Sequence, residues 1–391
     1  MKKFKNSLFF TGLCCLISLL AAEIAFAQAN TQQLHSYLRQ GIEKALNLET
    51  QSAIGFFNKA VELDREDPTG YAFLALTYLF FHEISYLPAE RLKNEVFMLR
   101  YADEALGRGQ KRIGNDEKVD EKDGQAYFAM TMATIVKVRW AIRQKRYFAM
   151  ARDTSAAWEY MQKAQAAGPQ VTDIYFPFGL LHYHIGHLPG LARFLSSLLI
   201  TAGNQRQGLQ ELELVAQKGD LLKELSQTEL VSAYLYFEKQ PAKALPLALE
   251  LKEKFPRNYN FSFALANTYS ELQRFPEALA IAQELNKNIQ AGKPPFFPQL
   301  QSRYDILMGR IFFNQAEYGQ SAEHLQLVLR DTTLYNARNR AAALLRLGMI
   351  HDILKERNEA ETYYSRVLEI EGGEGSAQVE AKKYLHEPYR K

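Results

Sequence analysis

The chain has 391 residues, enough for two or three globular domains or for one long array of repeats. Its 47 basic and 44 acidic side chains nearly balance, so the charge provides no strong field for nucleic acid, and we expect no nucleic acid among its partners. Both cysteines, Cys14 and Cys15, lie near the start, so the chain beyond residue 27 has no thiol for a disulfide, a metal or a nucleophile, which excludes several classes of enzyme.

Residues 1–27 have the pattern of a cleaved export signal. Three lysines precede an apolar run over residues 8–22, and small side chains follow at Ala25 and Ala27, where a signal peptidase reads them. A lipid-anchored form and an uncleaved anchor are the alternatives, but Leu13 before Cys14 is unlike the small residue that precedes a modified cysteine. We therefore expect cleavage after Ala27 and a periplasmic or secreted protein.

Residues 28–107 show the first signs of paired helices. Gly41 and Ala53 are small residues twelve positions apart, and Phe57 and Ala60 continue the apolar spacing of a helix. A second unit begins near Tyr71. Small residues at this separation allow two helix backbones to approach closely, so the spacing predicts helical hairpins.

The next segment, residues 108–123, is rich in charge, and we expect it to be a solvated loop. Residues 124–218 are predicted to be helical but irregular, with a long helix over about 125–146. Ala157 and Met161 fit the second helix of a hairpin, and an insertion before Gly208 interrupts the spacing.

Residues 219–370 carry the clearest pattern. A small residue in one predicted helix is followed twelve positions later by another in the next helix. Ala244 also lies 34 residues before Ala278. The pairs are Ala266 and Ala278, Gly309 and Ser321, and Gly348 and Ala360.

These residues and spacings resemble the tetratricopeptide repeat, a 34-residue unit of two helices. The resemblance implies an all-α, right-handed superhelical solenoid of antiparallel helix pairs, with about seven or eight units. A solenoid needs a polar cap, so residues 371–391 are expected to be a capping helix, over 376–386, and a tail.

In proteins of this family the first helices line a concave face that holds an extended peptide or a partner helix. Carried over to this chain, the resemblance implies that Asn267 hydrogen-bonds a bound backbone and that Arg310 engages carboxylates. Ala233 and Met349 depart from the family's carboxylate clamp, so we do not expect capture of a carboxy-terminal peptide. The predicted partner-binding residues are Tyr236, Phe263, Asn267, Arg310 and Phe313.

Candidate catalytic and metal motifs are weak. His182 and His184 would point about 200° apart on a helix and have no nearby acidic ligand. The stretch after His82 lacks the second histidine of a zinc protease, because Tyr86 stands there, and lysines interrupt the acidic run over 116–124 that superficially suggests a calcium loop. We expect no catalytic residue, no metal and no cofactor.

The sequence therefore predicts a protein-protein interaction scaffold that is not an enzyme. One alternative is a helical ligand-binding protein, metal-binding protein or enzyme with a pocket in the irregular middle beside His182 and His184. Another is a peripheral outer-membrane assembly subunit that docks through the apolar segment Leu188 to Ile200, which is too short to cross a bilayer.

Overall fold

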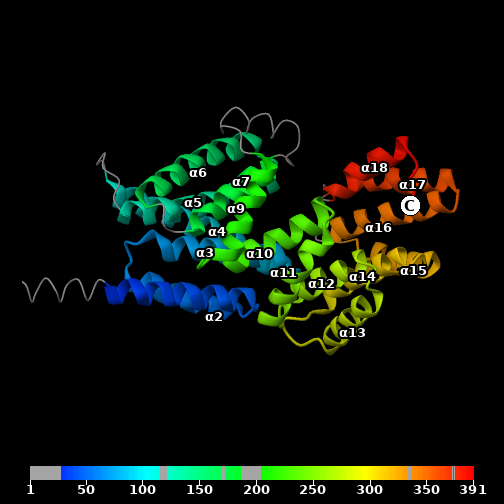
Figure 1. Ribbon diagram of the computed structural model, residues 1–391, viewed down its shortest axis with the longest axis horizontal. Helices are drawn as coiled ribbons and strands as arrows, with labels where there is room; N and C mark the ends of the chain where they lie inside the picture. Colours follow the sequence, from blue (N-terminus) through cyan, green and yellow to red (C-terminus); the bar gives the residue numbers. More distant parts are fainter. Residues whose placement is uncertain are drawn as a thin grey trace, which may run out of the picture. The chain divides into compact units, whose positions relative to one another are not determined.

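The computed structural model describes residues 28–114, 121–168, 172–185, 204–332, 336–371, 373 and 375–391. Over these residues every regular element is a helix and none is a strand, as Figure 1 shows, so the predicted all-α class is confirmed. No helix in this part of the chain is both long enough and apolar enough to span a membrane. The predicted export signal and the apolar segment 188–200 lie outside the described residues.

The helices form two compact units, Met1–Lys223 (unit 1) and Glu224–Lys391 (unit 2). Unit 1 consists of consecutive helical hairpins. Its first helix covers residues 28–46. The elements that follow are α2 (Thr50–Leu63), α3 (Pro68–Ile84), α4 (Pro88–Ile113), α5 (Glu121–Arg143), α6 (Tyr147–Ala167), η1 (Thr172–Ile174), α7 (Tyr175–Ile185) and α9 (Gln205–Lys218).

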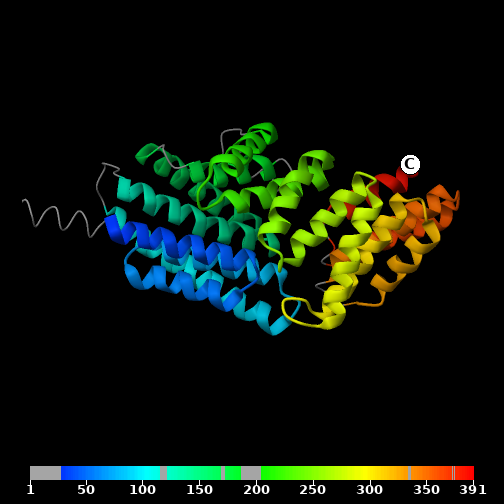
Figure 2. The ribbon, with the colours of Figure 1, turned by 60° about the horizontal axis from the view of Figure 1, so that its bottom comes forward.

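Unit 2 begins within α10, five residues after the predicted start of the regular repeats at 219. Figure 2 shows its helices following one another as hairpins in chain order. Its elements are α10 (Lys223–Ser232), η2 (Ala233–Phe237), α11 (Pro241–Lys254), α12 (Tyr259–Glu271), α13 (Phe275–Ala291), η3 (Pro298–Leu300), α14 (Gln301–Asn314), α15 (Tyr318–Leu329), α16 (Ala337–Ile353), α17 (Arg357–Glu369) and α18 (Ser376–His386).

Close approach of the paired helices explains the twelve-residue spacing. In the α14–α15 hairpin, Ser321 donates its hydroxyl to the carbonyl oxygen of Gly309 at 2.7 Å. A Cβ added to Gly309 would come within 2.7 Å of Leu325, and one added to Gly348 within 2.5 Å of the Tyr364 ring. In each case a large residue sixteen positions later fills the space that the glycine leaves, so the pattern encodes a packed hairpin.

The same contact recurs in unit 1, where a Cβ on Gly41 would come within 2.5 Å of the Phe57 ring. The irregular middle has the same contact between a glycine and a large side chain, since a Cβ on Gly179 of α7 would lie 2.8 Å from Leu212 of α9. The predicted insertion separates those two helices in sequence without removing their packing. Within the described residues the two units hold eight hairpins, in agreement with the predicted seven or eight.

The hairpin turns share one backbone conformation. In six of them the second residue after the first helix has a positive φ of 54–65°, the left-handed conformation that commonly ends a helix. The residue that follows usually donates its backbone N–H five positions back, as Arg274 does to the carbonyl oxygen of Tyr269 at 2.9 Å. The six residues are Leu48, Lys145, Lys239, Gln273, Ala316 and Lys355.

In unit 2 the hairpins stack in sequence order. Helix α12 contacts α14, α14 contacts α16, and α16 contacts the predicted cap helix α18. Buried side chains from consecutive hairpins form one core cluster that includes Leu325, Leu344, Tyr364 and Ala381. The predicted solenoid of helix pairs is therefore confirmed within this unit.

The predicted loop over 108–123 needs correction. Helix α4 continues to Ile113 and α5 already begins at Glu121, so both ends of the segment are helical and only residues 115–120 lie outside the described part. Gly109 contributes to the packing of α4 on α5, where a Cβ would come within 2.4 Å of Met130. Charge pattern alone does not separate a loop from the exposed side of a helix whose other side is packed.

Candidate functional site

Three of the predicted partner-binding residues come together on the first helices of unit 2. Tyr236 lies on η2, Asn267 on α12 and Arg310 on α14. Arg310 donates from Nη1 to Asn267 Oδ1 at 3.1 Å, and Asn267 donates from Nδ2 to Tyr236 Oη at 3.3 Å. The Arg310 guanidinium also lies 5.5 Å from the centre of the Tyr236 ring, within cation-π range. We call these three residues the Asn267 cluster.

A π-helical turn positions the aromatic member of this cluster. Residues Ala233–Phe237 form η2, and Glu238 donates its backbone N–H to the carbonyl oxygen of Ala233, five positions back. Such wider turns occur mostly as local insertions in α-helices, often at functional sites. Tyr236 is 39% exposed here, so part of its side chain remains available for contact.

Arg346 of α16 brings a second guanidinium to the same place. Burial, followed by the charge of Arg310, lowers the pKa of Arg346 to about 9, whereas Glu271 and Glu380 act in the opposite direction. The group therefore still carries its proton at neutral pH. Among the described residues neither Arg310 nor Arg346 has a carboxylate within ion-pair distance.

The other two predicted residues are buried. Phe263 is 1% exposed, and the Arg303 guanidinium lies 4.3 Å from the centre of its ring. Arg303 is fixed in turn, because it donates from Nη1 to Asn260 Oδ1 at 2.5 Å. Phe313 is 5% exposed and lies against Tyr389 of the C-terminal segment. Neither phenylalanine presents open surface in this structure.

Sequence reasoning missed Arg303 and Arg346. When the family pattern is applied position by position, the contact position on α16 is Met349, and Arg346, three positions earlier, is passed over. Positions three apart lie close together on a helix, so the signal was an arginine one turn away from an expected contact position.

His182 is packed and hydrogen-bonded. His182 is buried, and its Nδ1 lies 2.6 Å from Glu211 Oε2 on α9. Its ring contacts Trp158 and Phe178. The described residues contain no group of histidine, cysteine, aspartate or glutamate side chains suited to hold a metal ion.

His82 likewise serves the core. It is buried, its Nδ1 donates to the carbonyl oxygen of Arg91 at 3.0 Å, and its ring meets Trp140 edge-on. Burial lowers the pKa of this histidine, so it is neutral at pH 7. Glu83 beside it pairs with Arg139 at 3.1 Å.

Unit 1 contains a pocket of about 540 Å³ between the first helix and parts of the predicted irregular middle, and neither His182 nor His184 lines it. Its walls are mostly apolar, with Leu38, Phe128 and Ile174 among them, and its polar lining includes His35 and Asp173. This volume falls in the range of small-molecule sites.

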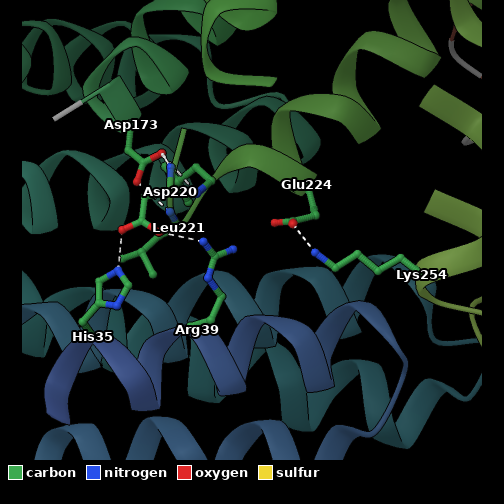
Figure 3. Close-up of polar contacts among 8 residues, drawn as sticks. His35, Arg39, Asp173, Asp220, Leu221, Glu224 and Lys254 are labelled. Atoms are coloured by element: carbon green, nitrogen blue, oxygen red, sulfur yellow. Dashed lines mark hydrogen bonds and ion pairs between the residues drawn. The ribbon is translucent and has the colours of Figure 1, made fainter. Parts of the chain in front are cut away.

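Two aspartates stabilise the loop at residues 220–222 beside this pocket (Figure 3). The buried Asp173 carboxylate accepts backbone N–H groups from Asp220, Leu221 and Leu222 at 3.0, 2.8 and 3.2 Å. Burial raises the pKa of Asp173, while these hydrogen bonds act to lower it. The exposed Asp220 carboxylate lies between His35 Nε2 at 2.5 Å and Arg39 Nη2 at 2.7 Å. Figure 3 also shows the Lys254 to Glu224 ion pair of unit 2, at 2.5 Å.

Comparisons with known proteins add little to this geometry. No family model matches the chain, and no curated protein matches it. A solved structure with similarity is the crystal structure of the P58(IPK) TPR domain, 14% identical, with coverage of 92% of this chain and 99% of that chain and a TM-score of 0.23. A TM-score this low supports no argument from that structure, so the tetratricopeptide-like character rests on the hairpin contacts described above.

Proposed function

We propose that the chain is a protein-interaction scaffold in which the first helices of unit 2 hold a segment of a partner protein. The observation that carries the proposal is the Asn267 cluster, to which three successive hairpins each contribute one side chain, with Arg346 from a fourth close by. A contact surface assembled from separate repeats suits an extended partner, because the segment can cross several helices in turn.

The donors of this site favour an acidic segment. Arg310 and Arg346 supply guanidinium groups that match carboxylates in geometry, and the Tyr236 ring adds a flat contact surface. Because the two arginines are close enough to lower the pKa of Arg346, an incoming carboxylate would relieve their mutual repulsion. We therefore propose that an aspartate or glutamate side chain of the partner lies between them.

The site of action that we propose is outside the cytoplasm, as a periplasmic or secreted protein. The support is the pattern of residues 1–27 and the absence of cysteine after them. Mass spectrometry of the mature protein tests this directly, with Gln28 as the expected first residue and an intact Met1 start as the contradicting result.

Site-specific photo-crosslinking tests the scaffold function. Tyr236 on the first-helix side and Leu327 on the second helix α15 are matched, at 39% and 37% exposed. A photoreactive phenylalanine at Tyr236 should crosslink one discrete partner, whereas the same probe at Leu327 should not. Arg310→Gln in the Tyr236 probe protein should abolish the adduct. Equal adducts from both positions, or an adduct insensitive to Arg310→Gln, would contradict the proposal.

The pocket of unit 1 supports a second candidate function, the binding of a small apolar molecule. Its volume and largely apolar walls are the observation in its favour. A thermal-shift screen with a neutral apolar dye should show saturable binding. Ala164→Phe places a ring in the pocket and should remove that binding. The exposed Ala242→Phe on α11 is the control, and equal dye binding by both variants would retire this candidate.

A further inference from the structure

The C-terminal segment, residues 387–391, lies against the first helices of unit 2. Tyr389 donates its backbone N–H to Asp352 Oδ2 of α16 at 2.8 Å. The Tyr389 ring lies 6.1 Å from the ring of Phe313 on α14 and meets Tyr384 at 5.3 Å, nearly perpendicular. The segment therefore spans two neighbouring first helices and covers the predicted contact residue Phe313.

Lys391 extends this contact to the end of α14. Its Nζ lies 3.4 Å from the carbonyl oxygens of both Phe313 and Asn314. The carbonyls at a helix C-terminus carry partial negative charge and attract a cation. The ammonium also lies 5.7 Å from the ring centre of Phe313 and 5.5 Å from that of Tyr318.

Asp352 is fixed in position to receive a backbone donor. Its side chain is 1% exposed, and it accepts from Arg357 Nη1 at 3.0 Å and from Tyr364 Oη at 2.8 Å. Its third donor is the main-chain N–H of Tyr389, which every residue except proline carries. The carboxylate can therefore hold an extended segment without selecting its side chain.

This contact area adjoins the Asn267 cluster on the same helix face. Phe313 and Asn314 follow Arg310 by three and four positions on α14, so all three lie on one side of that helix. Asn314 also donates from Nδ2 to Ser270 Oγ of α12 at 3.0 Å. A partner segment that leaves Arg310 along α14 would reach Phe313 within one helical turn.

We propose that Phe313, Asn314 and Asp352 form a subsite for an extended segment with an aromatic residue followed two positions later by a basic one, and that Tyr389 and Lys391 occupy it as an internal ligand. The proposal rests on the proposed function, because it extends the same partner-binding surface. A partner whose segment continues beyond the Asn267 cluster must displace residues 387–391 from this subsite.

A peptide added in trans tests the subsite without any partner. The probe is a fluorescent, amidated peptide with the sequence of residues 386–391, and anisotropy measures its binding to the full chain. Tethering gives the internal segment a millimolar effective concentration, so the unmodified chain should bind the probe weakly. The Tyr389→Ala/Lys391→Ala double variant should bind at least about tenfold more tightly, because its own segment competes less well. Arg390→Ala changes the exposed residue between them and should behave like the unmodified chain.

Equal binding by the double variant and Arg390→Ala, or no binding by either, would overturn the proposal. A second readout does not depend on the double variant, and so it holds even if that variant folds less well than the unmodified chain. A photoreactive phenylalanine at Tyr389 of the otherwise unmodified chain should form an internal adduct with α14 or α16, in addition to any adduct with the neighbouring Tyr384 of α18, and the absence of an adduct with α14 or α16 would also overturn it. Since neither readout uses a partner, failure here leaves the Tyr236 crosslinking result untouched, and the reverse also holds.

Discussion

Units 1 and 2 use the same contact between paired helices, but unit 1 also contains three much longer helices. Gly41 against Phe57 in unit 1 repeats the arrangement of Gly348 against Tyr364 in unit 2. The helices α12 to α17 have 12–17 residues, whereas α4, α5 and α6 have 26, 23 and 21. The helices of unit 2 bring side chains from several hairpins into one polar cluster, whereas α5 and α6 of unit 1 border an apolar pocket. Pairing thus follows a local packing rule that both units share, although the sites that they hold differ.

The largest effect should come from filling the glycine contact in unit 2. Gly348→Leu places atoms where the Tyr364 ring lies, and that ring cannot move aside because it is buried and its hydroxyl is bonded to Asp352. We expect a loss of roughly 3 kcal/mol in the free energy of unfolding of unit 2, as for severe overpacking. Chemical denaturation, with amide hydrogen exchange used to monitor each unit separately, measures this change in the free energy of unfolding.

Gly319→Ala on α15 is the control, because an added Cβ there meets nothing within 4 Å. It should change the stability of unit 2 by less than about 0.5 kcal/mol, because Gly319 lies in the first turn of α15 and its new Cβ meets no neighbour. Similar losses from both substitutions would show that the glycine contact does not define the hairpins.

In unit 1 a second sensitive contact should be the set of hydrogen bonds that Asp173 accepts from the backbone of residues 220–222. Asp173→Ala leaves three backbone N–H groups of residues 220–222 without their acceptor, which should cost about 2 kcal/mol or more. Asp220→Ala removes only exposed ion pairs and should cost less than about 1 kcal/mol. Thermal unfolding and amide exchange at 220–222 separate the two, and equal losses would contradict the account.

A shared effect should appear at the hairpin turns. Gln273 in unit 2 and Lys145 in unit 1 both have positive φ, at 58° and 54°, which strains a residue with a side chain. Gln273→Gly and Lys145→Gly should each stabilise their unit by about 1 kcal/mol, because glycine adopts this conformation freely. Calorimetry measures the change, and a gain in only one unit would mean that the turns are not equivalent.

The smallest effect should be a pH dependence confined to unit 1. Burial lowers the pKa of His82 below its ordinary value of 6.5, so the unfolded chain binds a proton at higher pH than the folded chain does. The stability that neutral His82 contributes is fully present above pH 6.5 and is lost as the pH falls from 6.5 through the lower pKa of the folded state. Denaturation of unit 1 between pH 7.5 and 5 should show this slope, and His82→Gln should flatten it. If stability changes with pH as steeply in His82→Gln as in the unmodified chain, a group other than His82 causes the pH dependence.

Local spacing predicted much of the fold. The glycine and small-residue pairs identified the hairpins, and the cap helix α18 has the predicted bounds of Ser376 and His386. The end of α4 at Ile113 was missed because charge on an exposed helix side looks the same as charge in a loop.

The candidate site was predicted only in part, for a different reason. The family pattern indicated Tyr236, Asn267 and Arg310, which the structure brings together. It could not indicate that Arg303 covers Phe263 or that Tyr389 covers Phe313, because each covering side chain comes from a different element. Contacts between repeats depend on the register of stacking, and no single repeat encodes that register.

The most direct test of the central claim is the affinity of the full chain for the partner that the Tyr236 probe captures. Isothermal titration should show that Arg310→Gln weakens binding by about tenfold or more, because it removes charged hydrogen bonds at the centre of the contact. Arg366→Gln changes an exposed arginine on the second helix α17 and should leave the affinity unchanged. Unchanged binding by Arg310→Gln, or equal weakening by both variants, would contradict the assignment of the first helices of unit 2 as the binding surface.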